Sequence, residues 1–194
     1  MKPKEFFLKE LALNVETHYK LKSLLPDIEK AIKIIHKKIK LGGKLMLCGN
    51  GGSAADAQHL SAEYLVRLRP NVNRKPIPAI SLAQDTSTLT ACGNDYDFSD
   101  VFKRPFQALA KKNDVLIAIT TSGNSSNIIK VLKDAHSKKI TTLGFLGGSG
   151  GKCKKFCDIK LIVPSKSTAR IQECHIFLGH FIFEQVEKLI LKEQ

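Results

Sequence analysis

The chain has 194 residues, of which 43% are hydrophobic and 25% charged, and this composition excludes disordered, collagen-like and coiled-coil proteins. Domains cluster at about 100 to 200 residues, so we expect one domain, residues 1–194, built around one core. Lysine and arginine number 31 against 18 acidic residues, a formal net charge of +13. The basic residues are mostly lysines spread along predicted helices, without a nucleic-acid-binding motif, so we expect no nucleic-acid partner.

The cysteines and the N-terminus bear on the compartment of the protein. The five cysteines are an odd number without the spacing of a disulfide framework, which favours a reducing compartment. Residues 1–16 mix lysine and glutamate with apolar residues, unlike a signal peptide. No apolar run approaches the ~20 residues of a membrane helix. We therefore expect a cytoplasmic protein without a membrane partner.

Short apolar runs alternate with helical patterns along the chain. Helical patterns open it over 3–24 and 26–41, and the run 44–48 then precedes a glycine-rich turn and a helical stretch over 54–68. The other four apolar runs are 77–82, 115–119, 141–146 and 159–163. Short strands that alternate with helices predict an α/β fold with a five-stranded parallel sheet covered by helices on both faces.

The last predicted helix, 168–192, is apolar over more of its surface than the single stripe of a surface helix. It must therefore be buried on more than one side. In a chain of this length a second subunit would cover the other side, which predicts a homo-oligomer. The N-terminal helical pair is the alternative cover.

Two turns after predicted strands are suited to bind anions. Residues 50–53 enter a helix, where free backbone N–H groups and the helix dipole favour phosphate. Residues 49–54, read as Gly49-x-Gly51-x-x-Ala54, also fit a loose dinucleotide fingerprint, but Arg67, Arg69 and Pro70 stand where that motif needs an acidic ribose partner. Residues 120–125 offer hydroxyls and backbone donors for a phosphate or a polyol, although helix capping alone accounts for such residues as well.

Four polar residues on two predicted helices could carry chemistry. His59 and Glu63 are four residues apart and project from one helix face. That spacing suits two ligands of one metal ion or a base beside an acid, and a surface pair is the plainer alternative. Gln172 and His180 lie about 80° apart around the last helix. The sequence does not say which face of that helix meets a site.

Several segments together resemble one protein family. The segment 48–59 (CGNGGSAADAQH), with 93–95 (GND), 120–125 (TTSGNS) and 170–175 (RIQECH), closely resembles the phosphoheptose isomerases of the sugar isomerase (SIS) domain superfamily. The resemblance covers nearly the whole chain. It implies a single SIS domain with a five-stranded parallel sheet, assembled as a homotetramer with active sites between subunits and with the N-terminal helices and the long C-terminal helix in the interface.

The resemblance also implies a reaction and the residues that perform it. The family converts sedoheptulose 7-phosphate to D-glycero-D-manno-heptose 7-phosphate, the first step towards the heptose of bacterial lipopolysaccharide or related glycans. One zinc ion per subunit would be bound by His59, Glu63, Gln172 and His180. The residues expected to hold the phosphorylated seven-carbon sugar are Asn50, Gly51, Gly52, Glu63, Asn94, Asp95, Thr120, Thr121, Ser122, Ser125 and Gln172. One departure is Ala169, where some members carry an acidic residue.

The chemistry of this reaction suits the same residues. Moving a carbonyl from C2 to C1 requires removing a proton beside the carbonyl and returning it to the neighbouring carbon through an enediol. We assign Glu63 as the base and His180 as the acid, with a cation stabilising the enediolate. Because a metal-bound group is a poorer proton carrier, the metal either binds in only part of the cycle or is structural.

A different class of function remains as the alternative. A non-catalytic SIS domain would bind phosphosugars or a protein partner without turning anything over. The joint presence of Glu63, Gln172 and His180 argues against it, since a binding module has no need for groups that transfer protons.

Overall fold

The computed structural model describes residues 2–193 and contains one sheet of five parallel strands in the order β2-β1-β3-β4-β5. The strands are β1 (Leu45–Gly49), β2 (Ala79–Ser81), β3 (Val115–Thr120), β4 (Thr141–Gly147) and β5 (Ile159–Val163). Each lies within a residue or two of its predicted position. The predicted α/β fold with a five-stranded parallel sheet is confirmed.

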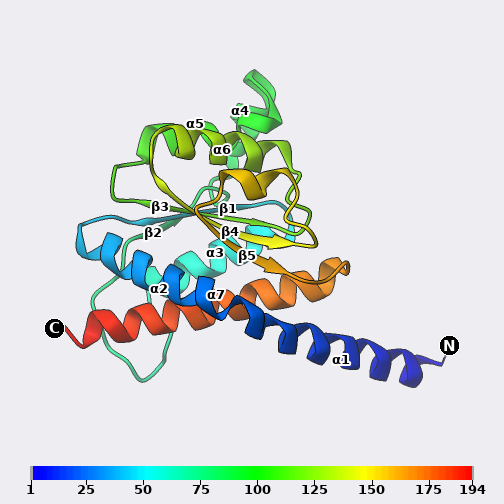
Figure 1. Ribbon diagram of the computed structural model, residues 1–194. Helices are drawn as coiled ribbons and strands as arrows, with labels where there is room; N and C mark the ends of the chain where they lie inside the picture. Colours follow the sequence, from blue (N-terminus) through cyan, green and yellow to red (C-terminus); the bar gives the residue numbers. More distant parts are fainter. Residues whose placement is uncertain (1, 194) are drawn as a thin grey trace.

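Helices cover both faces of the sheet (Figure 1). They are α1 (Pro3–Lys20), α2 (Leu25–Lys40), α3 (Gly52–Leu65), α4 (Thr86–Asp95), α5 (Lys103–Leu109), α6 (Ser126–Ser137) and α7 (Thr168–Leu191). Short 3₁₀ helices span Leu21–Leu24, Phe98–Asp100 and Lys152–Phe156. Helices α2, α3 and α7 pack on one face, while α5 and α6 pack on the other.

The strands are mostly apolar, as expected for strands covered on both faces. Along β1, Leu45 and Leu47 join the core beneath α2, α3 and α7, whereas Met46 and Cys48 join the core beneath α5 and α6. Successive side chains of a strand point to opposite faces, so a strand covered on both sides reads as a continuous apolar run.

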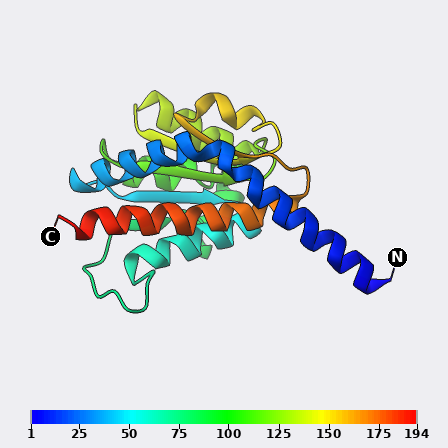
Figure 2. The same ribbon diagram turned by 60° about the horizontal axis from the view of Figure 1, so that its bottom comes forward.

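Helix α7 is covered mainly by helices of its own chain. It packs beside α2 and α3 below the sheet (Figure 2), so the N-terminal helices supply cover, as in the alternative drawn from the sequence. Phe177 and Phe181 nevertheless remain 49% and 39% exposed. No helix within residues 2–193 has the length and apolarity that a bilayer crossing demands.

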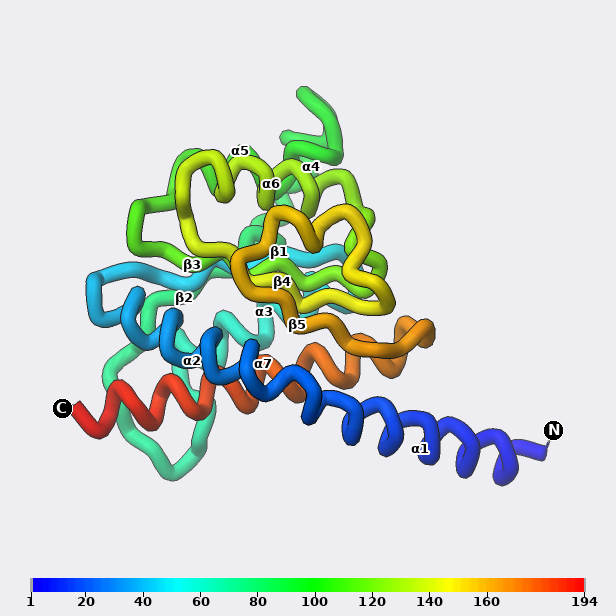
Figure 3. The backbone as a smooth tube through the Cα atoms, in the orientation of Figure 1, coloured from blue at the N-terminus to red at the C-terminus, as the bar shows by residue number. Residues whose placement is uncertain are grey.

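The predicted first helix is interrupted before its expected end. A 3₁₀ turn at Leu21–Leu24 separates α1 from α2, and Pro26 follows in the first turn of α2, where its missing N–H is tolerated. Helix α1, on the N-terminal side of this turn, extends away from the rest of the molecule (Figure 3). Its exposed side chains include Phe6, Phe7 and Leu11.

A buried histidine on α7 makes the stability of the fold depend on pH. His175 is fully buried, its Nε2 lies 3.1 Å from the carbonyl oxygen of Leu146, and burial lowers its pKa to about 4. Below about pH 6.5 the unfolded chain binds a proton that the folded chain rejects. Between pH 7 and pH 4 this group should therefore lower the free energy of unfolding by about 3 kcal/mol. Urea titrations at both pH values should show a smaller loss in His175→Gln, and equal losses would contradict the assignment.

Candidate active site

The strand order places the two polar turns side by side. Strand β1 has β2 on one side and β3 on the other, and the helices that follow β1 and β3 pack on opposite faces of the sheet. A crevice opens at such a reversal, beyond the carboxyl ends of the strands. The turn after β1 and the turn after β3 therefore meet at one edge.

An amide pair joins these turns. Asn50 and Asn127 donate to each other's side-chain oxygens at 2.9 and 2.8 Å, and Asn127 is 2% exposed. The Asn127 oxygen also accepts from the backbone N–H of Ile128 at 2.9 Å. Asn127 was not among the predicted site residues, and its only signal was a polar residue two positions after the 120–125 turn.

A small cavity lies between the turns and gathers six of the predicted sugar-binding residues. Its volume is about 80 Å³ and its lining is Asn50, Ser53, Ile119, Thr120, Thr121, Ser122, Ser125 and Gln172. A second hollow, about 310 Å³, shares Thr121 and Ser122 and continues over Gly147 and Gly148. Ser53 was not among the predicted site residues, although it lies in the 48–59 segment.

Two glycines begin α3 at this cavity, and each is needed for a different reason: Gly51 for its backbone conformation and Gly52 for the close approach to α7. Gly51 has φ +54°, a conformation that side chains disfavour. A Cβ on Gly52 would lie 2.6 Å from Nε2 of Gln172, so the absence of a side chain leaves room for this amide. The predicted residues Gly51 and Gly52 thus lie beside the cavity.

Replacing Gly52 with alanine should therefore act through Gln172. The stability should stay close to that of the wild type, because the end of a glutamine side chain can move aside. We expect the displaced amide to lower kcat/KM about tenfold, equivalent to about 1.4 kcal/mol. A double-mutant cycle checks the route. In a Gln172→Ala background Gly52→Ala should add no further loss, and an additive loss would contradict this explanation.

The second feature of the site is a cluster of three side chains of the kinds that bind metal ions. His59 and Glu63 on α3 meet His180 on α7, and one ligand atom from each lies within 4.8 Å of the others. The Nε2 atoms of His59 and His180 are 2.7 Å apart, and Nε2 of His59 is 3.3 Å from Oε1 of Glu63. Ligands of a tetrahedral zinc ion are about 3.3 Å apart, so a small shift of one imidazole fits the ion.

The electrostatics of the cluster favour neutral imidazole at His180. Burial, and after it the neighbouring His59, lower the pKa of His180, while Glu63 partly offsets them. Neutral imidazole is the form that binds metal ions. His59 is the most open of the three, with 47% of its side chain exposed against 18% for Glu63.

Two predicted residues lie elsewhere. Asn94 and Asp95 are exposed at the end of α4, where the Asn94 amide donates to the Asp95 carboxylate at 2.8 Å. Neither is among the described residues that line the cavity, and α4 projects from the body of the molecule (Figure 1). Within one chain these residues and the cavity are separate.

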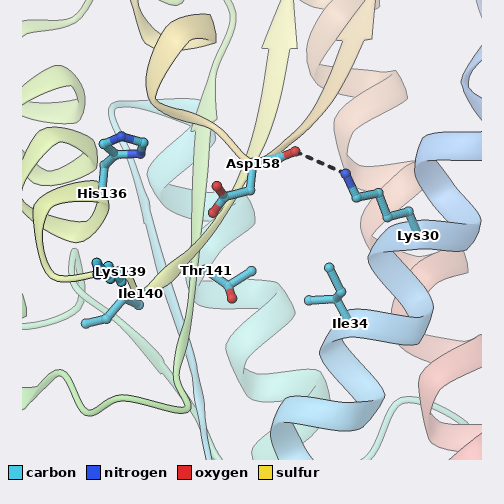
Figure 4. A pocket seen from close by; sticks show the side chains of 7 residues that line it. All are labelled: Lys30, Ile34, His136, Lys139, Ile140, Thr141 and Asp158. Carbon is cyan, nitrogen blue, oxygen red and sulfur yellow. Dashed lines mark hydrogen bonds between the residues drawn. The ribbon is translucent and has the colours of Figure 1, made fainter.

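A larger hollow lies at the opposite edge of the sheet. It measures about 550 Å³ and its lining is Lys30, Ile34, His136, Lys139, Ile140, Thr141 and Asp158 (Figure 4). Thr141 begins β4 and Asp158 directly precedes β5, so this hollow faces the amino ends of these strands. Open α/β sheets bind ligands at the carboxyl ends of their strands. Because this hollow is at the amino ends, we do not assign it to the active site despite its volume.

Known proteins share this fold and sequence. The SIS domain model matches residues 14–147. A phosphoheptose isomerase from Clostridium acetobutylicum is 48% identical over 170 residues, covering 88% of this chain and 86% of the relative. One from Aquifex aeolicus is 52% identical over 157 residues, covering 81% of each.

Solved structures agree with the sequence relatives. The phosphoheptose isomerase GmhA of Neisseria gonorrhoeae has a TM-score of 0.90 at 36% identity, covering 96% of this chain and all 100% of that one. A phosphoheptose isomerase of Francisella tularensis has a TM-score of 0.93 at 34% identity, covering 97% and 100%. The chain therefore belongs to the SIS domain family, and within it to the phosphoheptose isomerases.

Proposed function

We propose that this protein is a ketose–aldose isomerase that converts sedoheptulose 7-phosphate to D-glycero-D-manno-heptose 7-phosphate. The observation that carries the proposal is the meeting of His59 and Glu63 with His180 on the same pair of helices that borders the hydroxyl-rich cavity. A module that only binds phosphosugars needs the cavity but not the cluster.

Helices α3 and α7 run side by side in the same direction, with the cavity between the turns near their starts and the His59, Glu63 and His180 cluster further along. Gly52 faces Gln172 near the start of both helices, and His59 faces His180 about two turns further on. A sugar whose phosphate binds between the turns would extend along α3 and α7 to reach the cluster. The hydroxyls of Thr120, Thr121, Ser122 and Ser125 and the backbone N–H groups at the start of α3 suit the phosphate.

The side chains of the cluster divide the proton transfers between carbon and oxygen. Glu63 takes the proton from C1 of the ketose and returns it to C2 of the enediol, which leaves the carbonyl at C1. His180, with its lowered pKa, moves the hydroxyl proton between the two oxygens as a neutral imidazole, which can donate one proton and accept another. No proton is gained or lost overall.

The donor set also fits a zinc ion. We propose that His59, Glu63 and His180 bind it, with Gln172 as the fourth ligand carried over from the family. A cation there stabilises negative charge on the enediolate oxygens. Because a metal-bound carboxylate or imidazole is a poorer proton carrier, Glu63 and His180 would carry protons while the ion is absent, or the ion would serve the structure.

We further propose a cytoplasmic homotetramer that acts at the first step towards the heptose of lipopolysaccharide or a related glycan. Exposed apolar residues on α1, together with Phe177 and Phe181, support association, because monomers rarely expose a large apolar patch. Asn94 and Asp95, separate from the cavity of their own chain, would contribute to the site of a neighbouring subunit. Light scattering should give four times the chain mass of 21.5 kDa, and a monomer at micromolar concentration would contradict it.

The function is tested with sedoheptulose 7-phosphate in D₂O, by following aldose formation and deuterium uptake by NMR. The expected result is conversion with deuterium at the carbon that receives the proton. Repeating it after chelation shows whether the metal takes part in turnover. No conversion and no exchange by folded, zinc-loaded protein would favour the binding module.

A further inference from the structure

A buried cluster of charges joins the 66–78 segment to α7. The Glu187 carboxylate is fully buried. Its Oε1 accepts from Nε of Arg69 at 2.7 Å and its Oε2 accepts from Nε of Arg74 at 2.5 Å. The Arg74 side chain is 2% exposed. The segment passes beside the C-terminal half of α7 (Figure 2).

Other donors of Arg74 cap the end of α3, and its Nη1 also donates to the carbonyl oxygen of Lys75 at 3.1 Å. Its Nη2 donates to the carbonyl oxygen of Glu63 at 2.7 Å, and its Nη1 donates to that of Tyr64 at 2.9 Å. The last carbonyls of a helix lack partners within the helix and carry the negative end of its dipole. One guanidinium therefore binds the end of α3 on one side and a carboxylate of α7 on the other.

Further contacts show that this link lies in line with the reactive cluster. Gly179 packs so closely on α3 that a Cβ there would lie 2.6 Å from Leu60. One turn on, the rings of Tyr64 and Phe183 have centroids 4.1 Å apart, and the Tyr64 hydroxyl donates to the carbonyl oxygen of Phe183 at 3.2 Å. A shift by one turn, about 5.4 Å, would break all of these contacts and separate His59 from His180.

Apolar packing tolerates sliding better than a charged pair with directed hydrogen bonds. A buried ion pair seldom adds net stability over apolar residues of the same volume, because desolvation offsets the attraction. Its geometry is nevertheless strict, since a carboxylate left without its guanidinium is costly to bury.

We propose that Arg74 and Glu187 are positioning residues, which set the register of α3 against α7 and thereby hold Glu63 and His59 opposite His180. The inference rests on the proposed function of that cluster. It assigns neither residue a contact with the substrate.

The test compares Glu187→Gln with a matched variant elsewhere. Asp114→Asn likewise removes the charge from a buried pair, because Asp114 is 1% exposed and its Oδ2 lies 2.6 Å from Nζ of Lys44. That pair is beside the amino end of β3, remote from the cluster. For each variant we would measure kcat, KM, Tm and the zinc affinity of the protein in competition with a chromophoric chelator.

Glu187→Gln should lower kcat about tenfold or more with KM within about twofold, the pattern of a misplaced catalytic group, and should weaken zinc binding about tenfold. Asp114→Asn should lower Tm without changing kcat or zinc affinity. If Glu187→Gln keeps the wild-type kcat and zinc affinity, the buried charges of Arg74 and Glu187 only stabilise the fold and the proposal is wrong.

A second variant and the zinc measurement keep the test decisive. Arg74→Lys retains the charge but lacks the planar fork that reaches a carboxylate and two carbonyls at once, so it should show the same losses if Glu187→Gln does not fold. Unchanged kcat and zinc affinity in Arg74→Lys would equally overturn the proposal. If the wild type leaves sedoheptulose 7-phosphate unconverted, the proposed function fails, while the zinc competition still decides the positioning role.

Discussion

Glu63→Gln should lower kcat by about 10²-fold or more while the fold remains intact. The amide has nearly the same shape as the carboxylate but cannot accept the proton from carbon. Glu63 lies on the surface of α3 towards His180 and is partly exposed, so its replacement leaves the core undisturbed. His180→Ala should cause a loss of similar size. Initial rates of aldose formation measure the effect, and circular dichroism checks the fold.

Glu184→Gln is the matched control. Glu184 lies one turn beyond His180 on α7, where it pairs with Lys188 at 2.6 Å on the outside of the helix. Its replacement should leave kcat unchanged. Near-native turnover by Glu63→Gln or by His180→Ala would overturn the acid–base assignment.

Phe183→Ala should lower the free energy of unfolding by about 3–5 kcal/mol. The Phe183 ring is fully buried between α7 and α3 and packs against Tyr64, so truncation removes apolar contacts and leaves a cavity. Because natural domains are stable by only about 5–15 kcal/mol, the loss would be a large fraction of the total. Urea denaturation followed by circular dichroism measures it.

Leu109→Ala is the control for this loss. Leu109 ends α5 and is 43% exposed, so its truncation should cost less than about 1 kcal/mol. Equal losses in the two variants would mean that the α3–α7 contact is not a main part of the core.

The sheet could be predicted because its strands are buried on both faces. The runs 115–119 and 159–163 are apolar and bounded by turns, and the structure places β3 and β5 at the same residues, give or take one. Asn50 and the 120–125 turn line one cavity, at the carboxyl edge where open α/β sheets bind ligands. The positions of the strands, and the edge of the sheet at which the polar turns lie, could thus be predicted from the sequence.

Contacts that depend on how two helices pack were not accessible. The sequence could place His59 beside Glu63, but their approach to His180 depends on which face of α7 meets α3. The link from Arg74 to Glu187 was missed because the 66–78 segment has no periodicity that predicts its path. The separation of Asn94 and Asp95 from the cavity depends on how far α4 projects, which no local pattern encodes.

The contact of His59 with His180 joins positions 121 residues apart in the chain. An unfolded chain does not hold these two rings and Glu63 together, so a cation bound there would bind the native state alone. At a free concentration 100 times its Kd, such an ion would add about 2.7 kcal/mol to the free energy of unfolding. The supply of metal in the cell would then govern how often the protein opens to proteolysis, whether or not the ion takes any part in turnover.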